Sequence, residues 1–198
     1  MGKRCKGLRL TFLFLISFLI LSCNPLLNFG VVKENRVYRS GQPDKDDFRY
    51  IAKELKIKTL LVFKKDIAGF EKSYAKKFGI KIEHIPLTAS TPPTDAELDQ
   101  YFGILLNPAS YPLWMHCQGG ADRTGIMTAL YRIEFDHWSK WNAIFEMLTY
   151  FHIPLRYPKL TRYVYHYKRR YGKYRETDKE MEELEKFLKE KDLFDEPQ

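Results

Sequence analysis

Residues 116–125 read HCQGGADRTG and place one cysteine, Cys117, six positions before one arginine, Arg123, around three glycines. The apolar residues 113–115 that precede this stretch are typical of the end of a buried strand. After the stretch, apolar residues recur at helical spacing, at Ile126, Ala129, Leu130 and Ile133. We therefore predict a loop that leads from a strand directly into a helix.

Such a loop is suited to binding an anion, because unpaired backbone N–H groups and the helix dipole meet at a helix N-terminus. The glycines let the backbone approach a ligand closely. Arg123 adds a planar guanidinium that can bind two phosphate oxygens at once. The same positive charge favours the thiolate form of Cys117, which is the nucleophilic form. The predicted phosphate-binding residues are Gln118, Gly119, Gly120, Ala121, Asp122 and Arg123.

This stretch resembles the phosphate-binding loop of the protein tyrosine phosphatase superfamily, C-x5-R followed by Thr or Ser. Residues 37–43, VYRSGQP, resemble the Y-R-S-x-Q-P opening of atypical dual-specificity phosphatases from bacteria, fungi and plants. The resemblance covers roughly residues 31–171. It implies a phosphatase without metal or cofactor, in which Cys117 attacks phosphorus and forms a cysteinyl-phosphate that water then hydrolyses. It also implies that the Thr124 hydroxyl bonds the cysteine sulfur and that His116 orients the loop.

The sequence offers two aspartates as candidates for the general acid. Many dual-specificity phosphatases carry an aspartate early in the loop before the preceding helix, but Ala89 and Ser90 stand there. Asp95 is the only carboxylate in that loop, and its position also suits a first-turn helix residue. Asp122 directly precedes Arg123, which resembles the D-R-T loop of phosphoinositide phosphatases. We favour Asp122 as the acid and keep Asp95 as the alternative.

Three function classes fit these residues. The leading hypothesis is a hydrolase acting on a phosphorylated protein or on an inositol-phosphate-like substrate. The missing loop acid motivates a second hypothesis, a catalytically weak phosphate-binding module. A rhodanese-like sulfur transferase also uses a loop cysteine, but it usually lacks the D-R-T-G continuation. The five histidines are scattered, so no metal-ligand cluster is predicted.

The order of apolar runs and helix signals predicts an α/β fold, with a central, mostly parallel sheet and helices on both faces. A Thr94-x-x-Glu97 capping box predicts a helix start at residue 94. The predicted strands are residues 37–38, 59–63, 80–87 and 113–115. The predicted helices begin near Asp44 or Asp46, pass through Tyr74 and Phe78, begin at Thr94 and follow the cysteine loop.

The N-terminus has the pattern of an exported lipoprotein. Basic residues precede an apolar run over residues 10–21, which is too short to cross a bilayer. Residues 20–23, ILSC, resemble a bacterial lipobox, which implies lipidation of Cys23; an ordinary signal peptide or an uncleaved anchor is the alternative. We expect residues 1–23 to be the signal, 24–34 a tether, 35–175 the phosphatase domain and 176–198 an acidic C-terminal helix or tail. The protein would then be anchored in the bacterial cell envelope, on its periplasmic or extracellular side.

The charge distribution limits the possible partners. The formal charge of +8 includes four cations in the signal, so the remainder carries about +4. Residues 156–175 hold eight Lys or Arg, six Tyr and no carboxylate. This segment is most simply an amphipathic helix, with Leu160, Tyr163, Val164 and Tyr167 facing the core; contact with anionic lipid is the alternative. No nucleic-acid recognition motif accompanies the charge, so we expect no nucleic acid, and we expect a monomer.

Overall fold

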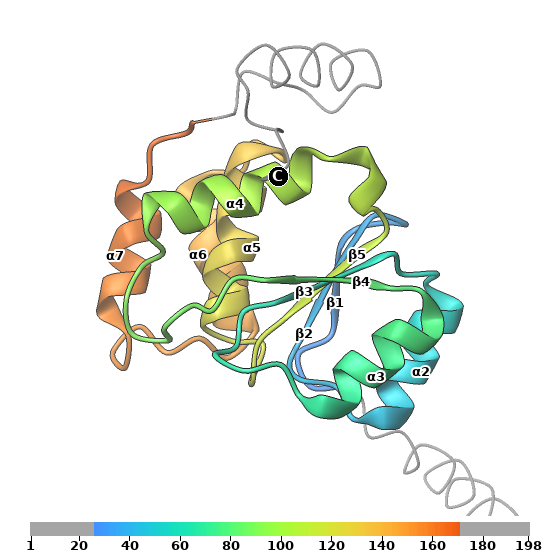
Figure 1. The fold of residues 1–198 in the computed structure, drawn as a ribbon. Helices are drawn as coiled ribbons and strands as arrows, with labels where there is room; N and C mark the ends of the chain where they lie inside the picture. Colours follow the sequence, from blue (N-terminus) through green and yellow to red (C-terminus); the bar gives the residue numbers. More distant parts are fainter. Residues whose placement is uncertain (1–25, 171–198) are drawn as a thin grey trace, which may run out of the picture.

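The computed structural model describes residues 26–170, in which five strands form a single sheet between two helical layers (Figure 1). The strand order is β1-β2-β5-β3-β4. Strands β2, β5, β3 and β4 are parallel, and β1 pairs antiparallel with β2 at the edge. The strands are β1 (Gly30–Lys33), β2 (Val37–Ser40), β3 (Thr59–Val62), β4 (Lys81–His84) and β5 (Leu113–His116).

Six α-helices of the described residues cover both faces of this sheet. Helices α2 and α3 lie on one face, and α4, α5, α6 and α7 lie on the other (Figure 1). They span α2 (Lys45–Glu54), α3 (Gly69–Phe78), α4 (Asp95–Leu106), α5 (Arg123–Glu134), α6 (Lys140–Thr149) and α7 (Pro158–His166), with a 3-10 turn at Pro108–Ser110. The predicted fold class, a mostly parallel sheet with helices on both faces, is confirmed.

Strands β2, β3 and β5, in the middle of the sheet, are buried on both faces, as parallel strands usually are. In β3, Leu60 and Val62 pack with the helices α2 and α3, whereas Leu61 packs into the larger core under α4 and α5. Successive side chains of a strand point to opposite faces, so a continuous apolar run supplies both cores. The two cores hold the sheet between the layers and place its carboxyl ends at one edge.

Helix starts follow the predicted caps. Asp44 caps α2 by accepting hydrogen bonds from the backbone N–H groups of Asp46 and Asp47. Thr94 and Glu97 form the predicted capping box of α4. The amphipathic segment begins its helix only at Pro158, and its residues Leu160 and Val164 are buried as expected.

Three sequence expectations differ from the structure or fall outside it. Residues 30–33 were expected in a tether but form β1, because a four-residue edge strand is too short to show a clear period-two pattern. Helix α6 was not identified separately within the helical C-terminal part. The proposed signal with Cys23 and the acidic segment 176–198 lie outside the described residues. Among residues 26–170, no helix has the length and hydrophobicity needed to cross a bilayer.

Candidate active site

The cysteine loop connects the central strand β5 to helix α5, as predicted. Strand β5 ends at His116 and α5 begins at Arg123. Because β2 and β3 flank β5 in parallel, their carboxyl ends lie beside the start of this loop. In the register of the sheet, Ser40 pairs with His116. The two stretches that carried the family resemblance, 76 positions apart in the chain, therefore meet at one edge of the sheet.

The thiol of Cys117 lies inside the loop and is 2% exposed. The backbone N–H of Gly120 donates a hydrogen bond to its Sγ over 3.2 Å. A backbone donor aimed at the sulfur stabilises a thiolate more than a neutral thiol. The turn that makes this contact needs a glycine, because Gly120 has φ of +71° and a Cβ there would lie 2.6 Å from the backbone nitrogen of Gly41.

Arg39, on β2, is a second arginine of the site that the sequence analysis did not single out. Its guanidinium is buried, donates to the backbone carbonyl of Gly120 and stacks 3.7 Å from the ring centroid of Tyr150. Burial lowers the pKa of Arg39 to about 10, which leaves the group charged at neutral pH. A buried cation thus supports the loop close to Cys117. In the sequence, the Y-R-S stretch at residues 38–40 was the signal that could have identified Arg39.

Further contacts hold the outer side of the loop. The Asn28 side chain donates to the Gly119 carbonyl over 2.7 Å. The backbone N–H of Gln42 donates to the Gln118 carbonyl over 3.0 Å. With loop carbonyls bound from outside, the loop conformation is determined before any ligand arrives, which favours electrostatic stabilisation of a transition state.

Beneath the loop, His116 and Glu71 form a buried pair. His116 Nε2 lies 3.2 Å from Glu71 Oε1, although the two groups are not aligned as in a good hydrogen bond. His116 Nδ1 lies 3.1 Å from the Cys117 carbonyl oxygen. Burial alone would raise the pKa of Glu71, but the contact with His116 and the Ala68 backbone lowers it overall. His116 therefore contacts the loop backbone, in agreement with its expected orienting role.

Asp122 is held by a histidine from a distant part of the chain. His152, in the loop between α6 and α7, places Nδ1 2.8 Å from Asp122 Oδ1. Its Nε2 lies 3.0 Å from the Thr161 hydroxyl on α7. Asp122 is the N-cap residue of α5 but makes no side-chain cap bond to the helix. Sequence reasoning missed His152, because an isolated histidine after a helix carries no motif.

The other predicted residues are placed as follows. The backbones of Gln118, Gly119, Gly120 and Ala121 form the loop, and the partly buried Arg123 is the first residue of α5. The Thr124 hydroxyl is buried and has no hydrogen-bond partner among the described residues, so the bond expected from Thr124 to sulfur is not formed in this structure.

Asp95 occupies a different environment from Asp122. It is the first residue of α4, and its side chain is 78% exposed and ion-paired with Arg170, which follows α7. This placement agrees with a first-turn helix residue. Within residues 26–170, no group of three or more His, Cys, Asp or Glu side chains is arranged to hold a metal ion.

Sequence comparisons agree with this site. A family model described as the tyrosine phosphatase family matches residues 24–184. The chain is 30% identical over 120 residues to the inositol diphosphatase SIW14 of Saccharomyces cerevisiae, covering 58% of this chain and 42% of the relative. It is 27% identical over 111 residues to the dual specificity protein phosphatase TpbA of Pseudomonas aeruginosa, covering 56% and 49%. The chain thus matches less than half the length of each of these two relatives.

Solved structures share the fold. The core catalytic domain of SIW14 from S. cerevisiae, crystallised with citrate, aligns over 87% of this chain and 98% of its own, with a TM-score of 0.66 and 22% identity. TpbA of P. aeruginosa aligns over 72% of this chain and 86% of its own, with a TM-score of 0.61 and 25% identity. With a loop cysteine and arginine at the carboxyl end of such a sheet, and with a family match over most of its length, the chain belongs to the tyrosine phosphatase family, a family of hydrolases.

Proposed function

We propose that this protein hydrolyses phosphomonoesters through a cysteinyl-phosphate intermediate on Cys117. The observation that carries the proposal is the buried Sγ that accepts the Gly120 N–H inside a loop opening onto the N-terminus of α5. A phosphate bound there meets backbone donors, the helix dipole and Arg123 on one side and a nucleophile on the other.

The reaction would proceed in two displacements. In the first, Sγ of Cys117 attacks phosphorus, the P–O bond to the leaving group breaks, and a general acid gives that oxygen its proton. In the second, water attacks phosphorus, the S–P bond breaks, and inorganic phosphate leaves. Arg123 and the loop N–H groups stabilise the equatorial oxygens in both steps.

We assign the general acid to Asp122 rather than Asp95. Asp122 belongs to the loop that surrounds the phosphate, and its carboxyl is held by His152. A carboxylate only accepts hydrogen bonds, so Nδ1 of His152 donates to ionised Asp122 while Nε2 accepts from the Thr161 hydroxyl. When Asp122 is protonated on its other carboxyl oxygen, Oδ1 can still accept from Nδ1, and the acidic proton stays available to the leaving group. Both states of an acid that cycles during turnover are therefore satisfied.

Two substrate classes are suggested by the relatives, one named as an inositol diphosphatase and the other as a dual specificity protein phosphatase. Between Cys117 and Arg123 the loop carries no cation and one carboxylate, Asp122. A highly charged polyphosphate would meet that carboxylate directly. We therefore propose phosphomonoesters, on proteins or on inositol-like alcohols, as the preferred class. A parallel screen of phosphopeptides, inositol monophosphates and inositol pyrophosphates tests this choice.

The experiment that tests the activity uses p-nitrophenyl phosphate. The wild type should hydrolyse it, and vanadate should inhibit the reaction by occupying the loop. Cys117→Ser should lose more than about a thousandfold in turnover while retaining phosphate binding, because the anion site survives without the thiolate. Arg123→Ala should lose both. Turnover in the serine variant close to that of the wild type would rule out the cysteinyl-phosphate route.

We further propose that the protein is exported and lipidated on Cys23, a site outside the described residues. The support is the basic, apolar and ILSC order of residues 1–23. Labelling cells with a clickable fatty acid should tag the wild type and not Cys23→Ala. Wild-type protein found in the cytoplasm with its first residues intact would contradict this proposal.

A further inference from the structure

The chain enters the fold against the active-site loop. The Leu27 carbonyl accepts a hydrogen bond from the Gly41 N–H over 2.6 Å, and the Asn28 side chain bonds the Gly119 carbonyl. Cys23 and Leu27 are four positions apart, and an extended chain of that length spans at most about 14 Å. A lipid on Cys23 would therefore hold Leu27 within about that distance of the membrane surface, and with it the active-site loop that the neighbouring Asn28 contacts.

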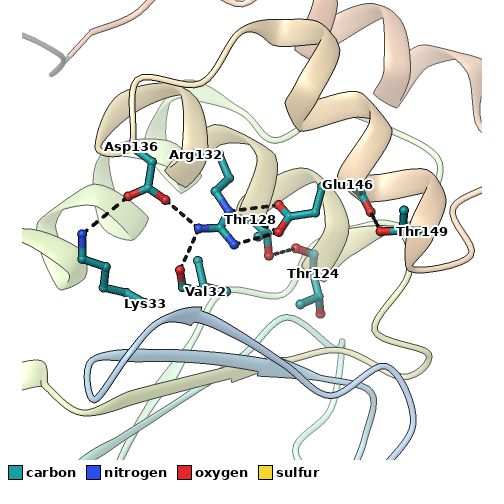
Figure 2. A network of polar contacts seen from close by, with 8 residues as sticks. All are labelled: Val32, Lys33, Thr124, Thr128, Arg132, Asp136, Glu146 and Thr149. Carbon is teal, nitrogen blue, oxygen red and sulfur yellow. Dashed lines mark hydrogen bonds and ion pairs between the residues drawn. The ribbon is translucent and has the colours of Figure 1, made fainter.

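We define the entry segment as residues 26–33, which end with β1. A network of ion pairs and a hydrogen bond fixes β1 to α5 and α6 (Figure 2). Arg132 on α5 donates to the Val32 carbonyl of β1 over 2.7 Å. The same guanidinium pairs with Asp136 at 2.6 Å and with Glu146 on α6 at 2.8 Å. Through Arg132, the entry segment and helix α6 are therefore held together.

Exposed apolar side chains follow α6 in the segment that contacts the active-site loop through His152. We define the apolar rim as Phe151, Ile153 and Leu155, which are 74%, 53% and 95% exposed. They flank His152, whose ring bonds Asp122 in the catalytic loop. Among the described residues, the exposed large apolar side chains other than Tyr50 lie either in the entry segment or between α6 and the end of α7: Leu27, Phe29, Val31, Trp141, Phe145, Leu148, Phe151, Ile153, Leu155 and Tyr165.

The segment that includes the apolar rim, residues 139–170, carries an excess of positive charge. Residues 139–170 carry seven Lys or Arg, of which Arg170 is paired with Asp95 on α4, and a single carboxylate, Glu146, which is paired with Arg132. Cations beside exposed aromatic and aliphatic side chains are the combination that binds anionic lipid surfaces. Exposed apolar side chains gain nothing from contact with water, whereas a lipid interface removes them from it.

We propose that the apolar rim inserts into the surface of an anionic bilayer and seats the active-site loop there. The substrate would be a phosphomonoester presented at that surface, such as a lipid headgroup or a juxtamembrane phosphoprotein residue. This inference rests on the proposed lipidation and phosphatase activity. Insertion shortens the distance between the loop and membrane-bound phosphate, which raises the effective concentration of that substrate.

Tryptophan fluorescence can test whether the apolar rim inserts into the bilayer, independently of the phosphatase activity. The lipidated full chain, purified from membranes, is reconstituted in vesicles of phosphatidylcholine and phosphatidylglycerol with brominated acyl chains, which quench tryptophan on contact. The variant is Phe151→Trp, and the matched control is Tyr50→Trp, since Tyr50 is 66% exposed on α2 across the sheet. Emission of the parent protein is subtracted, because it already contains three tryptophans.

We expect about half of the added emission of Phe151→Trp to be quenched and that of Tyr50→Trp to be nearly unchanged. Quenching should fall when phosphatidylglycerol is replaced by phosphatidylcholine. Equal emission changes in the two variants would overturn the proposal, because the rim would then face water or a protein partner. Hydrolysis of p-nitrophenyl phosphate by the same vesicles reports on the phosphatase activity separately. Loss of hydrolysis with the quenching intact would refute the proposed function and leave the membrane-bound rim standing.

Discussion

His152 and Asp122 lie 30 positions apart in the chain, yet their side chains meet over 2.8 Å at the active-site loop. The imidazole is buried, and its second nitrogen is bonded to Thr161. The ring cannot rotate without breaking both contacts. Asp122 is therefore held in one orientation by the loop between α6 and α7, a segment without any recognisable motif.

Asp122→Asn should reduce the hydrolysis of alkyl phosphates far more than that of p-nitrophenyl phosphate. An activated aryl leaving group needs little protonation as its bond breaks, whereas an alkoxide needs a full proton. General acids contribute about 10²–10⁴-fold, so the ratio of the two rates should change by at least about 100-fold. Asp95→Asn, the matched control, should change both rates by less than about tenfold. The selective loss appearing in Asp95→Asn instead would move the acid to the start of α4.

His152→Ala should show the same leaving-group dependence in a weaker form, with KM little changed, because Asp122 would remain but lose its orientation. We expect a loss of about tenfold on alkyl phosphates. His152→Gln should recover part of it, since an amide N–H can also donate to Asp122. Equal losses on alkyl and aryl substrates would indicate that His152 supports only the stability of the loop.

Gly120→Ala and Gly119→Ala should show which glycine of the loop is required for its conformation. A Cβ on Gly120 would lie within 2.8 Å of three atoms around Ser40, Gly41 and Asn28, and φ is positive. At Gly119 a Cβ has nothing within 4 Å. We expect Gly120→Ala to lower kcat/KM by more than about 100-fold and Gly119→Ala by less than about fivefold. Similar kinetics in the two variants would contradict the positive φ and the close contacts of Gly120.

Glu71→Gln should destabilise the fold by about 2 kcal/mol at neutral pH, because His116 would lose its buried carboxylate partner. The pKa of Glu71 is lowered from 4.5 in the folded protein. Its contribution to stability is therefore present above pH 4.5 and is lost as the pH falls through the lower folded value. Urea unfolding at neutral pH and near pH 3.5 should show the gap between variant and wild type closing.

The matched control for that measurement is Glu97→Gln. Glu97 accepts a hydrogen bond from the backbone N–H of the N-cap residue of α4, as Glu71 does in α3, but it is only half-buried and has no histidine partner. We expect a loss below about 1 kcal/mol for this variant. If the difference in unfolding free energy between wild type and Glu71→Gln does not change with pH, the whole effect comes from helix capping.

The sequence by itself determined the fold class and the chemistry of the loop. Both depend on local patterns: apolar runs long enough for buried strands, caps at Asp44 and Thr94, and a cysteine and an arginine six positions apart. Such patterns act over a few residues and can be read without knowing the rest of the chain. The same is not true of β1, whose four residues become a strand only because β2 offers an edge.

The tertiary structure alone decided which distant side chains serve the loop. Arg39, Glu71 and His152 each reach it from a different element, and no spacing in the sequence relates them to Cys117. The order of the strands places Arg39 beside the loop, whereas the packing of α6 and α7 on α5 brings in His152. Their roles follow from burial and long-range contact, which depend on the whole fold rather than on neighbouring residues. For the same reason only the structure could place Leu27 and Asn28 against the catalytic loop.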